Sequence, residues 1–418
     1  MGEWASVHSR QPEVVIGIDT RESGPWLAEQ VAGGLARSNV RARFAGLITT
    51  PGVAWLVRTG PFVAGVMISA SHNPYHDNGI KIFDHSGFKL PDDTEHELEA
   101  RIFALLETGI EPAPRGLVVD EGLDRQYVDY LASTMRGTLE GMSLVLDCAN
   151  GAASHLAPGL FARLGARVAA TACNPDGRNI NARCGALHVD PLRREVLARK
   201  AGAGIAFDGD ADRAILVSPS GRIVDGDCVL LLAARAMQQA GALRGPDGRP
   251  AVVATVMSNL GLERALAALS IGMVRTPVGD KYVLEEMVRC GANLGGEQSG
   301  HVIFRDYATT GDGLLTALRV LEIVTSSGRD LDELTRDLEV YPQVLVNVSV
   351  KEKRPLADLP SVREAIRKTE AAFGNAGRVL VRFSGTEPLA RVMVEGPDRD
   401  QVERHAARIA GAIRAELG

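Results

Sequence analysis

The sequence predicts an α/β protein with three related mixed-sheet domains and a smaller C-terminal α+β domain. Three segments repeat one plan, in which a short β-branched run leads through a polar or glycine-containing loop into an amphipathic helix pattern and another apolar run. The C-terminal part instead alternates short strand patterns with two helix patterns. With 418 residues, the chain is also too long for a single hydrophobic core.

The repeated segments are typical of βαβ units, which build parallel or mixed sheets covered by helices. They read "VVIGIDTRESGPWLAEQVAGGL", "LVLDCANGAASHLAPGLFARLG" and "VVATVMSNLGLERALAAL". Each is followed by an apolar run that ends in a polar loop: "SASHNP" after Gly65–Ile68, "DGDADR" after Gly204–Phe207, and "GEQSGH" after Ala292–Leu294. Because ligands bind beyond the carboxyl ends of strands in open α/β sheets, we expect these loops to face one shared cleft.

The C-terminal part predicts a β-α-β-β-α domain with a largely antiparallel sheet. Its patterns are, in order, "QVLVNVSVKE", a helix over Pro360–Phe373, "RVLVRFSG", "ARVMVEG" and a helix over Asp400–Leu417. Turn-rich segments predict domain boundaries near Gly116–Arg125, Gly241–Pro250 and Tyr341–Pro342. The four expected domains cover residues 1–120, 121–238, 239–341 and 342–418.

Composition excludes several classes of protein. Hydrophobic residues at 45% and charged residues at 23% describe an ordinary soluble globular chain. A net charge of −6 without any Lys/Arg-rich run argues against nucleic-acid and membrane partners, and leaves a small anionic ligand open. Five cysteines without CxxC spacing disfavour a disulfide framework and a zinc site, and fit a reducing cytoplasm. We expect neither an export signal nor a membrane-spanning segment.

The loop "DGDADR" predicts a magnesium site. Asp208, Asp210 and Asp212 alternate with small residues, so an extended loop would point all three carboxylates the same way. Their repulsion is costly unless a cation lies between them, and Mg²⁺ prefers oxygen ligands. An EF-hand is excluded, because Arg213 and Pro219 stand where that motif needs Gly and Glu. The alternative is a solvated acidic turn.

The segment "VRFSGTEPLAR" predicts a phosphate cradle. A strand that ends in Ser384, Gly385 and Thr386 offers hydroxyls and an unhindered backbone N–H to an anion. Arg382 and Arg391 add charge and forked donors. The segment is neither a Walker A loop nor a GxGxxG fingerprint. The alternative is a polar hairpin turn with two surface arginines.

The loop "GEQSGH" is a weaker candidate for sugar binding. Glu297 and Ser299 could bind neighbouring hydroxyls of a sugar, and His301 could hydrogen-bond or move a proton. A glycine-rich turn with a surface Glu is the alternative.

The loop "SASHNP" contains a candidate phosphoserine. Ser71 lacks the GxSxG frame of a hydrolase, which leaves acyl transfer with little support. A phosphorylated Ser71 would need a cation beside it, which the acidic loop could recruit. Lys81, on the next strand pattern, is a candidate proton-transfer group or phosphate partner. His72 is interpreted as a positioning residue, and a capping role for Ser71 is the alternative.

Taken together, these motifs resemble the α-D-phosphohexomutase family, most closely its bacterial phosphoglucosamine mutase branch. From about Trp4 to the C-terminus, "ISASHNPYHDNGIK", "DCANGA", "DGDADR", "VGDKYV", "GEQSGHVIF", "TTGDG" and "SGTEPLARVMVEG" follow in family order at family spacing. The resemblance implies a heart-shaped, four-domain cytoplasmic enzyme, a monomer or homodimer, that interconverts 6-phospho and 1-phospho sugars. Phosphoglucomutase or phosphomannomutase activity, or a non-catalytic sugar-phosphate-binding protein, remain the alternatives.

The resemblance also implies a site and its cofactors. One Mg²⁺ per chain and a phosphoserine are expected, with a sugar 1,6-bisphosphate as intermediate and activator. The resemblance implies that Ser71 is the phosphoserine and that one of its phosphoryl oxygens binds Mg²⁺ together with Asp208, Asp210 and Asp212, with Arg213 beside them. It implies His72 as a positioning residue and Lys81 and His301 as acid/base candidates. The sugar would be bound by Glu297 and Ser299, and the phosphate that is not transferred by Arg382, Ser384, Gly385, Thr386 and Arg391.

The chain departs from the family pattern at two places. Members usually begin with a strand carrying an "FGTDGIRG"-like motif, a full βα unit before "VVIGIDTR". We therefore expect domain one to be shortened by a strand and to lack a basic residue near the phosphoserine. The second departure is Ala211, where the metal loop more often has Gly. An alanine there is strained if the backbone needs a positive φ.

Overall fold

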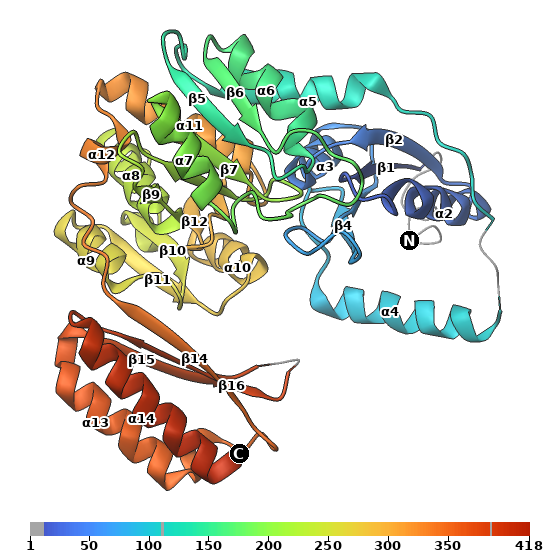
Figure 1. Cartoon of the computed structure of the whole chain (residues 1–418). Coiled ribbons are helices and arrows are strands. Elements are labelled where there is room, and N and C mark those ends of the chain that lie inside the picture. Colours follow the sequence, from blue (N-terminus) through green and yellow to red (C-terminus); the bar gives the residue numbers. More distant parts are fainter. Residues whose placement is uncertain (1–11, 110–112, 385–386) are drawn as a thin grey trace. The chain divides into compact units, whose positions relative to one another are not determined.

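The computed structural model describes residues 12–109, 113–384 and 387–418. They form two compact units, one of residues 12–257 and 270–336, the other of residues 258–269 and 337–418 (Figure 1). The first unit contains three mixed sheets with helices, and the second contains a small antiparallel sheet with helices. The predicted fold class is thereby confirmed. None of the helices described combines the length and apolar character that a bilayer crossing requires.

The first sheet has the strand order β2-β1-β3-β4. Its elements are β1 (Glu13–Ile18), α2 (Gly24–Arg37), β2 (Arg41–Leu47), α3 (Thr50–Thr59), β3 (Ala64–Ile68), β4 (Ile80–Asp84) and α4 (Asp92–Glu107). β1 is parallel to β2 and β3, whereas β4 is antiparallel to β3. Every residue of β3, "AGVMI", is buried, as expected for a strand covered on both faces.

The second and third sheets repeat this plan, with the orders β6-β5-β7-β8-β9 and β11-β10-β12-β13. The second comprises α5 (Glu121–Thr134), β5 (Ser143–Asp147), α6 (Ala153–Arg163), β6 (Arg167–Thr171), α7 (Asp190–Arg199), β7 (Ala203–Phe207), β8 (Ala214–Val217) and β9 (Ile223–Val224). The third comprises α8 (Gly226–Gln239), β10 (Ala251–Thr255), β11 (Gly272–Thr276), α10 (Asp280–Cys290), β12 (Leu294–Gly296), β13 (Val302–Phe304), α11 (Gly313–Ser327) and α12 (Leu331–Leu334). In each sheet the fourth strand runs antiparallel to the third.

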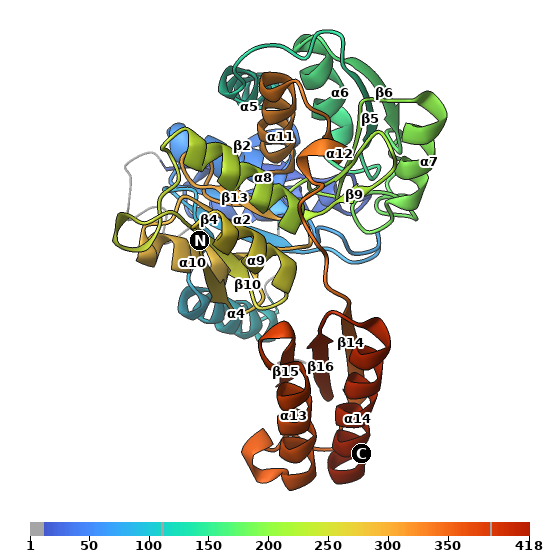
Figure 2. The same cartoon turned by 90° about the vertical axis from the view of Figure 1, so that its left-hand side faces the viewer.

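The second unit has the predicted β-α-β-β-α order and an antiparallel sheet, β14-β16-β15. Its elements are α9 (Leu260–Ala268), β14 (Gln343–Ser349), α13 (Pro360–Phe373), β15 (Arg378–Phe383), β16 (Leu389–Glu395) and α14 (Arg399–Leu417). α13 and α14 lie side by side against the strands (Figure 2). The buried Glu395 explains why α9 belongs to this unit, because its carboxylate accepts from Leu260 N at 2.9 Å and from the Arg378 guanidinium at 2.7 Å.

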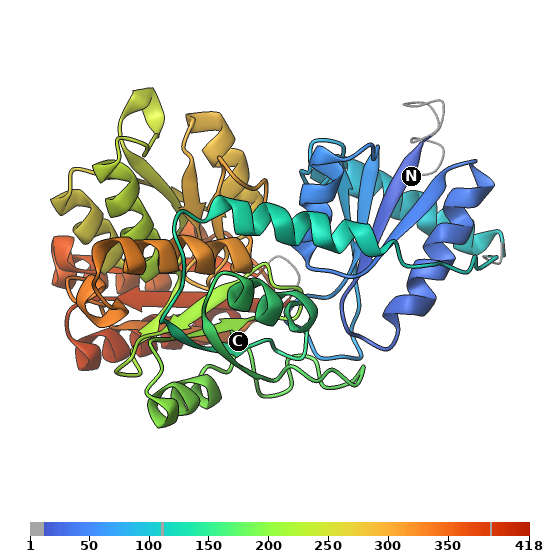
Figure 3. The same ribbon diagram turned by 90° about the horizontal axis from the view of Figure 1, so that it is seen from above.

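Helix α5 joins parts of the first unit, packing against α3, α6 and α11 (Figure 3). Asp312 caps the N-terminus of α11 by accepting from Leu315 N at 2.9 Å. The Tyr127 hydroxyl of α5 donates to the second oxygen of the same carboxylate at 2.7 Å. Burial raises the pKa of Asp312 to about 6, although the two hydrogen bonds oppose the shift.

Replacing Asp312 by Asn should change stability in a pH-dependent way. The folded-state pKa of about 6 lies above the ordinary value of 3.8, so wild-type stability loses this contribution as pH rises from about 4 through 6. The free energy of unfolding of the variant, relative to wild type, should be roughly 1–3 kcal/mol higher at about pH 7.5 than at about pH 4. Urea unfolding at both pH values measures it. Asp330→Asn, at the exposed N-cap of α12, is the control, and equal differences at both pH values would contradict the assignment.

Ala211 has a left-handed backbone conformation, with φ 57°. This is the positive φ at which an alanine, in place of the more common Gly of the metal loop, is strained. It lies in the loop between β7 and β8, where its N–H donates to Asp208 O at 3.1 Å and its carbonyl accepts from Gly313 N at 2.9 Å. A left-handed alanine costs about 1–2 kcal/mol, and its buried methyl group returns about 0.8 kcal/mol. The strain at this position is therefore modest.

Substituting Ala211 by Gly should leave the free energy of unfolding within about 1 kcal/mol of wild type, because relief of strain offsets the lost methyl burial and the greater entropy of the unfolded chain. Ala206→Gly is the matched control. Ala206 is equally buried but lies in β7 without a positive φ, so its loss should cost about 1–2 kcal/mol. Chemical denaturation of the two variants tests the difference. Equal losses would show that Ala211 carries no strain.

Candidate active site

Ser71 lies in the loop that follows β3. Its hydroxyl donates to Asp208 Oδ2 at 2.7 Å, and its Oγ lies 3.4 Å from His72 Nδ1. Burial and the Arg213 guanidinium lower the pKa of His72, so a neutral imidazole faces the hydroxyl. The Ser71 backbone is left-handed, with φ 49°, a conformation that non-glycine residues adopt chiefly where the surroundings enforce it.

The buried Arg21 guanidinium enforces the shape of this loop. It pairs with Asp19 at 2.9 Å, and Asp19 also accepts from the Ser69 hydroxyl at 2.6 Å. The carbonyl oxygens that accept from Arg21 belong to Ser71 at 3.0 Å, Asn73 at 2.9 Å, Asp77 at 3.0 Å, and Pro74. Sequence reasoning missed Arg21. The available signal was "DTR" directly after β1, a charged end to a buried strand like the three loops that were singled out.

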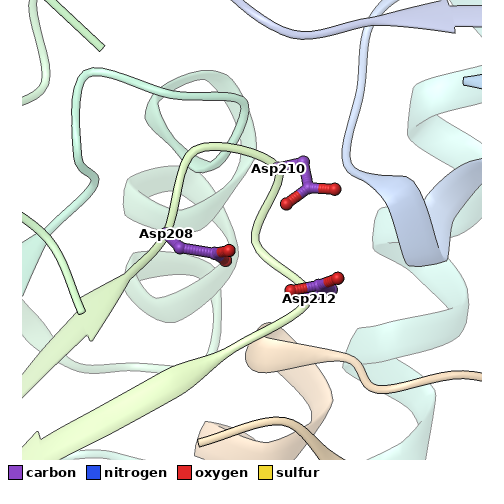
Figure 4. A group of neighbouring side chains, drawn as sticks. All are labelled: Asp208, Asp210 and Asp212. Atoms are coloured by element: carbon purple, nitrogen blue, oxygen red, sulfur yellow. The ribbon is translucent and has the colours of Figure 1, made fainter. Parts of the chain in front are cut away.

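The three predicted metal ligands converge. Asp208, Asp210 and Asp212 follow one another along the loop between β7 and β8 and lie as neighbouring side chains (Figure 4). One carboxylate oxygen from each lies within 4.8 Å of the others, and all three side chains are buried. The antiparallel register, with Phe207 opposite Ala214, holds the loop between two strands. The alternative of a solvated acidic turn is therefore wrong.

The cluster is short of positive charge. Burial, and then the carboxylates of Asp212 and Asp210, raise the pKa of Asp208 well above its ordinary value. Burial also acts to raise the pKa of Asp210, but the Lys81 ammonium, 2.6 Å from Asp210 Oδ2, outweighs it and holds that pKa below the usual range. Lys81 is 3.7 Å from Asp212 as well. Although burial opposes it, this pairing raises the pKa of Lys81, which favours a charged partner over a general base.

The residues present fit a divalent cation. Asp210 Oδ1 and Asp212 Oδ1 are buried without a hydrogen-bond partner among the described residues. A buried carboxylate oxygen left unpaired is costly, and oxygen donors at this spacing are the ligands that Mg²⁺ prefers. The Ser71 oxygen stands beside the same cluster. The donor set therefore suits a hard ion bridging the aspartates and the serine oxygen.

Segments from all three sheets touch the acidic loop. Thr50, at the start of α3, donates its N–H to Asp210 O at 3.0 Å and its hydroxyl to the Asp210 carboxylate. Gly300, after β12, accepts from Ala214 N at 3.1 Å. A Cβ on Gly209 would lie 2.4 Å from Ser71 O, so only glycine permits this approach. The structure thus brings the loops "SASHNP", "DGDADR" and "GEQSGH" together.

The third loop places His301 at the cluster. Its Nε2 lies 3.9 Å from Asp212 Oδ2 and 3.6 Å from Asp280 Oδ2, and neither ring nitrogen has a hydrogen-bond partner among the described residues. Glu297 Oε1 accepts from Gly279 N at 3.0 Å, while its other oxygen accepts from the Ser299 hydroxyl at 3.1 Å. The Glu297 charge also reaches Arg213, whose guanidinium lies 3.8 Å from Asp212.

The predicted phosphate loop lies in the second unit. Arg382 of β15 and Arg391 of β16 stand directly opposite each other. Burial and the charge of Arg391 lower the pKa of Arg382, and two opposed cations favour an anion between or beside them. Ser384 O accepts from Lys353 Nζ at 2.7 Å, a third basic group that sequence reasoning missed. Gly385 and Thr386, which were also predicted to bind the phosphate, lie outside the described residues.

Comparison with known proteins identifies the family of this chain. Sequence models of the phosphoglucomutase/phosphomannomutase family match the chain consecutively: alpha/beta/alpha domain I over residues 1–108, domain II over 125–221, domain III over 225–341 and the C-terminal domain over 345–412. A phosphoglucosamine mutase of Solibacter usitatus (strain Ellin6076) is 62% identical over 418 residues, covering 100% of this chain and 93% of that protein. A phosphoglucosamine mutase of Koribacter versatilis (strain Ellin345) is 51% identical over 415 residues, covering 97% and 89%.

A solved structure shows the same fold. The crystal structure of a phosphoglucomutase/phosphomannomutase family protein from Burkholderia thailandensis matches with a TM-score of 0.80 at 24% identity, covering 99% of this chain and 91% of that one. The resemblance that the motifs predicted is confirmed by matches to all four family domains and by relatives of high identity over the whole chain. This chain belongs to the phosphoglucomutase/phosphomannomutase family.

Proposed function

We propose that the protein is a phosphoglucosamine mutase, which interconverts glucosamine 6-phosphate and glucosamine 1-phosphate through a phosphoserine and a 1,6-bisphosphate intermediate. The observation that carries the proposal is the position of the Ser71 hydroxyl, 2.7 Å from Asp208 in a cluster of three buried aspartates, two of which, Asp210 and Asp212, each have one oxygen without a hydrogen-bond partner among the described residues. The relatives at 62% and 51% identity carry that activity in their names.

We further propose that Asp208, Asp210 and Asp212 hold one Mg²⁺ together with an oxygen of phosphorylated Ser71. When bound, the ion would offset part of the negative charge that the phosphoryl oxygens and the three carboxylates bring together. The chain's own cations act on the same group: Arg213 and Lys81 lie beside the cluster and stabilise the phosphoryl charge as it leaves the serine.

Each turnover would involve two phosphoryl transfers. Phosphoserine gives its phosphoryl group to the free sugar hydroxyl, whose proton moves to a neighbouring base; the O–P bond at Ser71 breaks as the new one forms. His301, buried and with neither ring nitrogen hydrogen-bonded within the described part of the chain, is the candidate for that proton. After the bisphosphate turns around, Ser71 recovers the other phosphoryl group.

The remaining residues would hold the sugar. Glu297 and Ser299 bind its hydroxyls, and their existing mutual hydrogen bond orients them for this. Arg382, Ser384, Gly385, Thr386 and Arg391 would bind the phosphate that is not being transferred. Such a grip positions the reacting hydroxyl without touching it, which is how binding energy far from the reacting atoms lowers a barrier.

Intact-mass analysis and substrate kinetics test the proposal together. Purified wild type should carry a phosphoryl group of about 80 Da that Ser71→Ala lacks. Wild type should convert glucosamine 1-phosphate at least about tenfold faster, in kcat/KM, than glucose 1-phosphate or mannose 1-phosphate. Ser71→Ala should lose turnover of all three. Ser133→Ala, an exposed serine of α5 whose hydroxyl donates to Tyr130 O, is the control, and it should keep the phosphoryl group.

Two results would reject parts of this assignment. Faster turnover of glucose 1-phosphate would replace the amino-sugar activity by phosphoglucomutase activity. Binding of all three sugars without turnover, in a chain that carries no phosphoryl group even after incubation with a sugar 1,6-bisphosphate, would indicate a non-catalytic binding protein.

Arg21 should act as a positioning residue. Arg21→Lys keeps the charge but offers at most three donors where five contacts are made, so the Ser71 loop loses its preset shape. We expect kcat to fall at least about tenfold with KM changed by less than about threefold. Arg178 forms an exposed ion pair with Glu22, so Arg178→Lys is the matched control and should leave kcat and KM unchanged. Lower stability with an unchanged kcat would show that Arg21 is merely structural.

A further inference from the structure

Two cysteines leave the second sheet side by side, outside the residues that the proposed function uses. β5 and β6 are parallel neighbours, with Asp147 opposite Thr171. The pairing continues beyond the strands, because Cys148 N donates to Thr171 O at 3.2 Å. Cys148 and Cys173 therefore follow adjacent strand ends, and the two side chains interact. In this register Cys148 stands opposite Ala172, one residue before Cys173, so the two cysteines are diagonal neighbours across strands whose spacing lies within the Cα range that disulfides span.

The two thiols differ in environment. Cys148 is fully buried, whereas Cys173 is partly exposed and its Sγ lies 3.4 Å from Ser154 O. Interaction with the Cys148 side chain lowers the pKa of Cys173 to about 6, and interaction with Cys173 together with burial raises the pKa of Cys148 well above its ordinary value. A partly exposed thiolate next to a protected thiol is the arrangement of an attacking and a resolving cysteine.

We propose that Cys148 and Cys173 form a redox-sensitive site that hydrogen peroxide converts into a disulfide. The Cys173 thiolate attacks the peroxide, taking one oxygen as a sulfenic acid while hydroxide leaves and is protonated to water. The Cys148 thiol then attacks the sulfenic sulfur; its proton joins the departing hydroxide, and a second water is released. Two thiols are oxidised and one peroxide is reduced to two waters. A small dithiol reverses the reaction.

The loop after Cys148 connects this pair to the acidic loop. Ala149 and Asn150 are left-handed, with φ 53° and 46°, and Asn150 N donates to Ala172 O at 2.6 Å. Ala152 N donates to Gly209 O at 2.8 Å. A Cβ on Gly151 would lie 2.3 Å from Gly209 O, so the two loops are in backbone contact.

Oxidation should therefore alter the acidic loop. A covalent S–S bond of about 2.05 Å is shorter than a hydrogen-bonded contact between two thiols. Bond formation would pull the sulfurs together and displace the loop after Cys148, in which Ala149 and Asn150 are already strained. Gly209, which lies between Asp208 and Asp210 and contacts this loop, would move with it. The disulfide state would loosen the loop that holds the three aspartates.

Mass spectrometry of the full chain tests the site without reference to catalysis or metal. Treatment with hydrogen peroxide near stoichiometry should remove two hydrogens, about 2 Da, and peptide mapping should assign the bond to Cys148 and Cys173. Dithiothreitol should restore the mass. Cys173→Ser and Cys148→Ala should abolish the change, whereas Cys290→Ser, a partly exposed thiol at the end of α10, should not. Addition of oxygen without a crosslink, or a bond to another cysteine, would overturn the proposal.

Hydrogen exchange tests the connection to the acidic loop. In oxidised protein, amides of residues 208–213 should exchange at least about threefold faster than in reduced protein, and dithiothreitol should reverse the effect. Peroxide-treated Cys173→Ser should match its untreated form. Unchanged exchange in protein that carries the mapped disulfide would overturn the coupling. Neither measurement depends on sugar turnover, so a failure of the mutase assignment is seen separately.

Discussion

The repulsion among three buried carboxylates is the constraint on which the rest of the site depends. Oxygens of Asp208, Asp210 and Asp212 lie within 4.8 Å of one another, where two unit charges repel by roughly 3–4 kcal/mol at an effective dielectric of about 20. Lys81 pairs with two of the three, which leaves negative charge facing the Ser71 oxygen. A phosphoryl group on that oxygen would add to the excess. The proposed phosphoserine therefore requires the proposed cation, since without a cation its negative charge would face carboxylates that Lys81 only partly offsets.

The fold meets this constraint by repeating one sheet three times. The shared strand order puts the third strand of each sheet beside an antiparallel fourth, and the polar loops lie between those two strands. In the first sheet, this register also returns the chain so that Lys81, opposite Met67 on β3, faces the acidic loop. The contacts of Thr50 and Gly300 with that loop come from two other sheets. One repeated topology thus supplies Ser71, the acidic cluster and the "GEQSGH" loop from different parts of the chain.

Sequence reasoning found what local pattern determines. Buried strands followed by polar loops are visible as apolar runs with abrupt ends, so Ser71 and the aspartates could be singled out before their contacts were known. Arg21 was missed although "DTR" directly follows β1, because a charged residue after a strand and before a helix is typical of a solvated turn, and its burial depends on carbonyls 50 or more residues away. Lys353 was missed for the same reason, since its acceptor, Ser384 O, is 31 residues away in the sequence. A single cysteine carries no signal at all until its neighbouring strand is known, which is why Cys148 and Cys173 were unremarkable in the sequence.

Backbone strain explains how these long-range contacts act on chemistry. Ser71 and Ala211 are both left-handed, at roughly 1–2 kcal/mol each, and both lie in loops that touch the same cluster. At Ser71 the turned backbone sends the carbonyl toward Arg21 and Asn181, at 3.0 and 2.9 Å, while the hydroxyl meets Asp208. An unstrained serine would not satisfy both directions at once. Because Arg21 and Asn181 fix the carbonyl, they also fix the direction of the Ser71 hydroxyl; in the proposed mechanism this sets the line of phosphoryl transfer, and in-line geometry is what that reaction most requires.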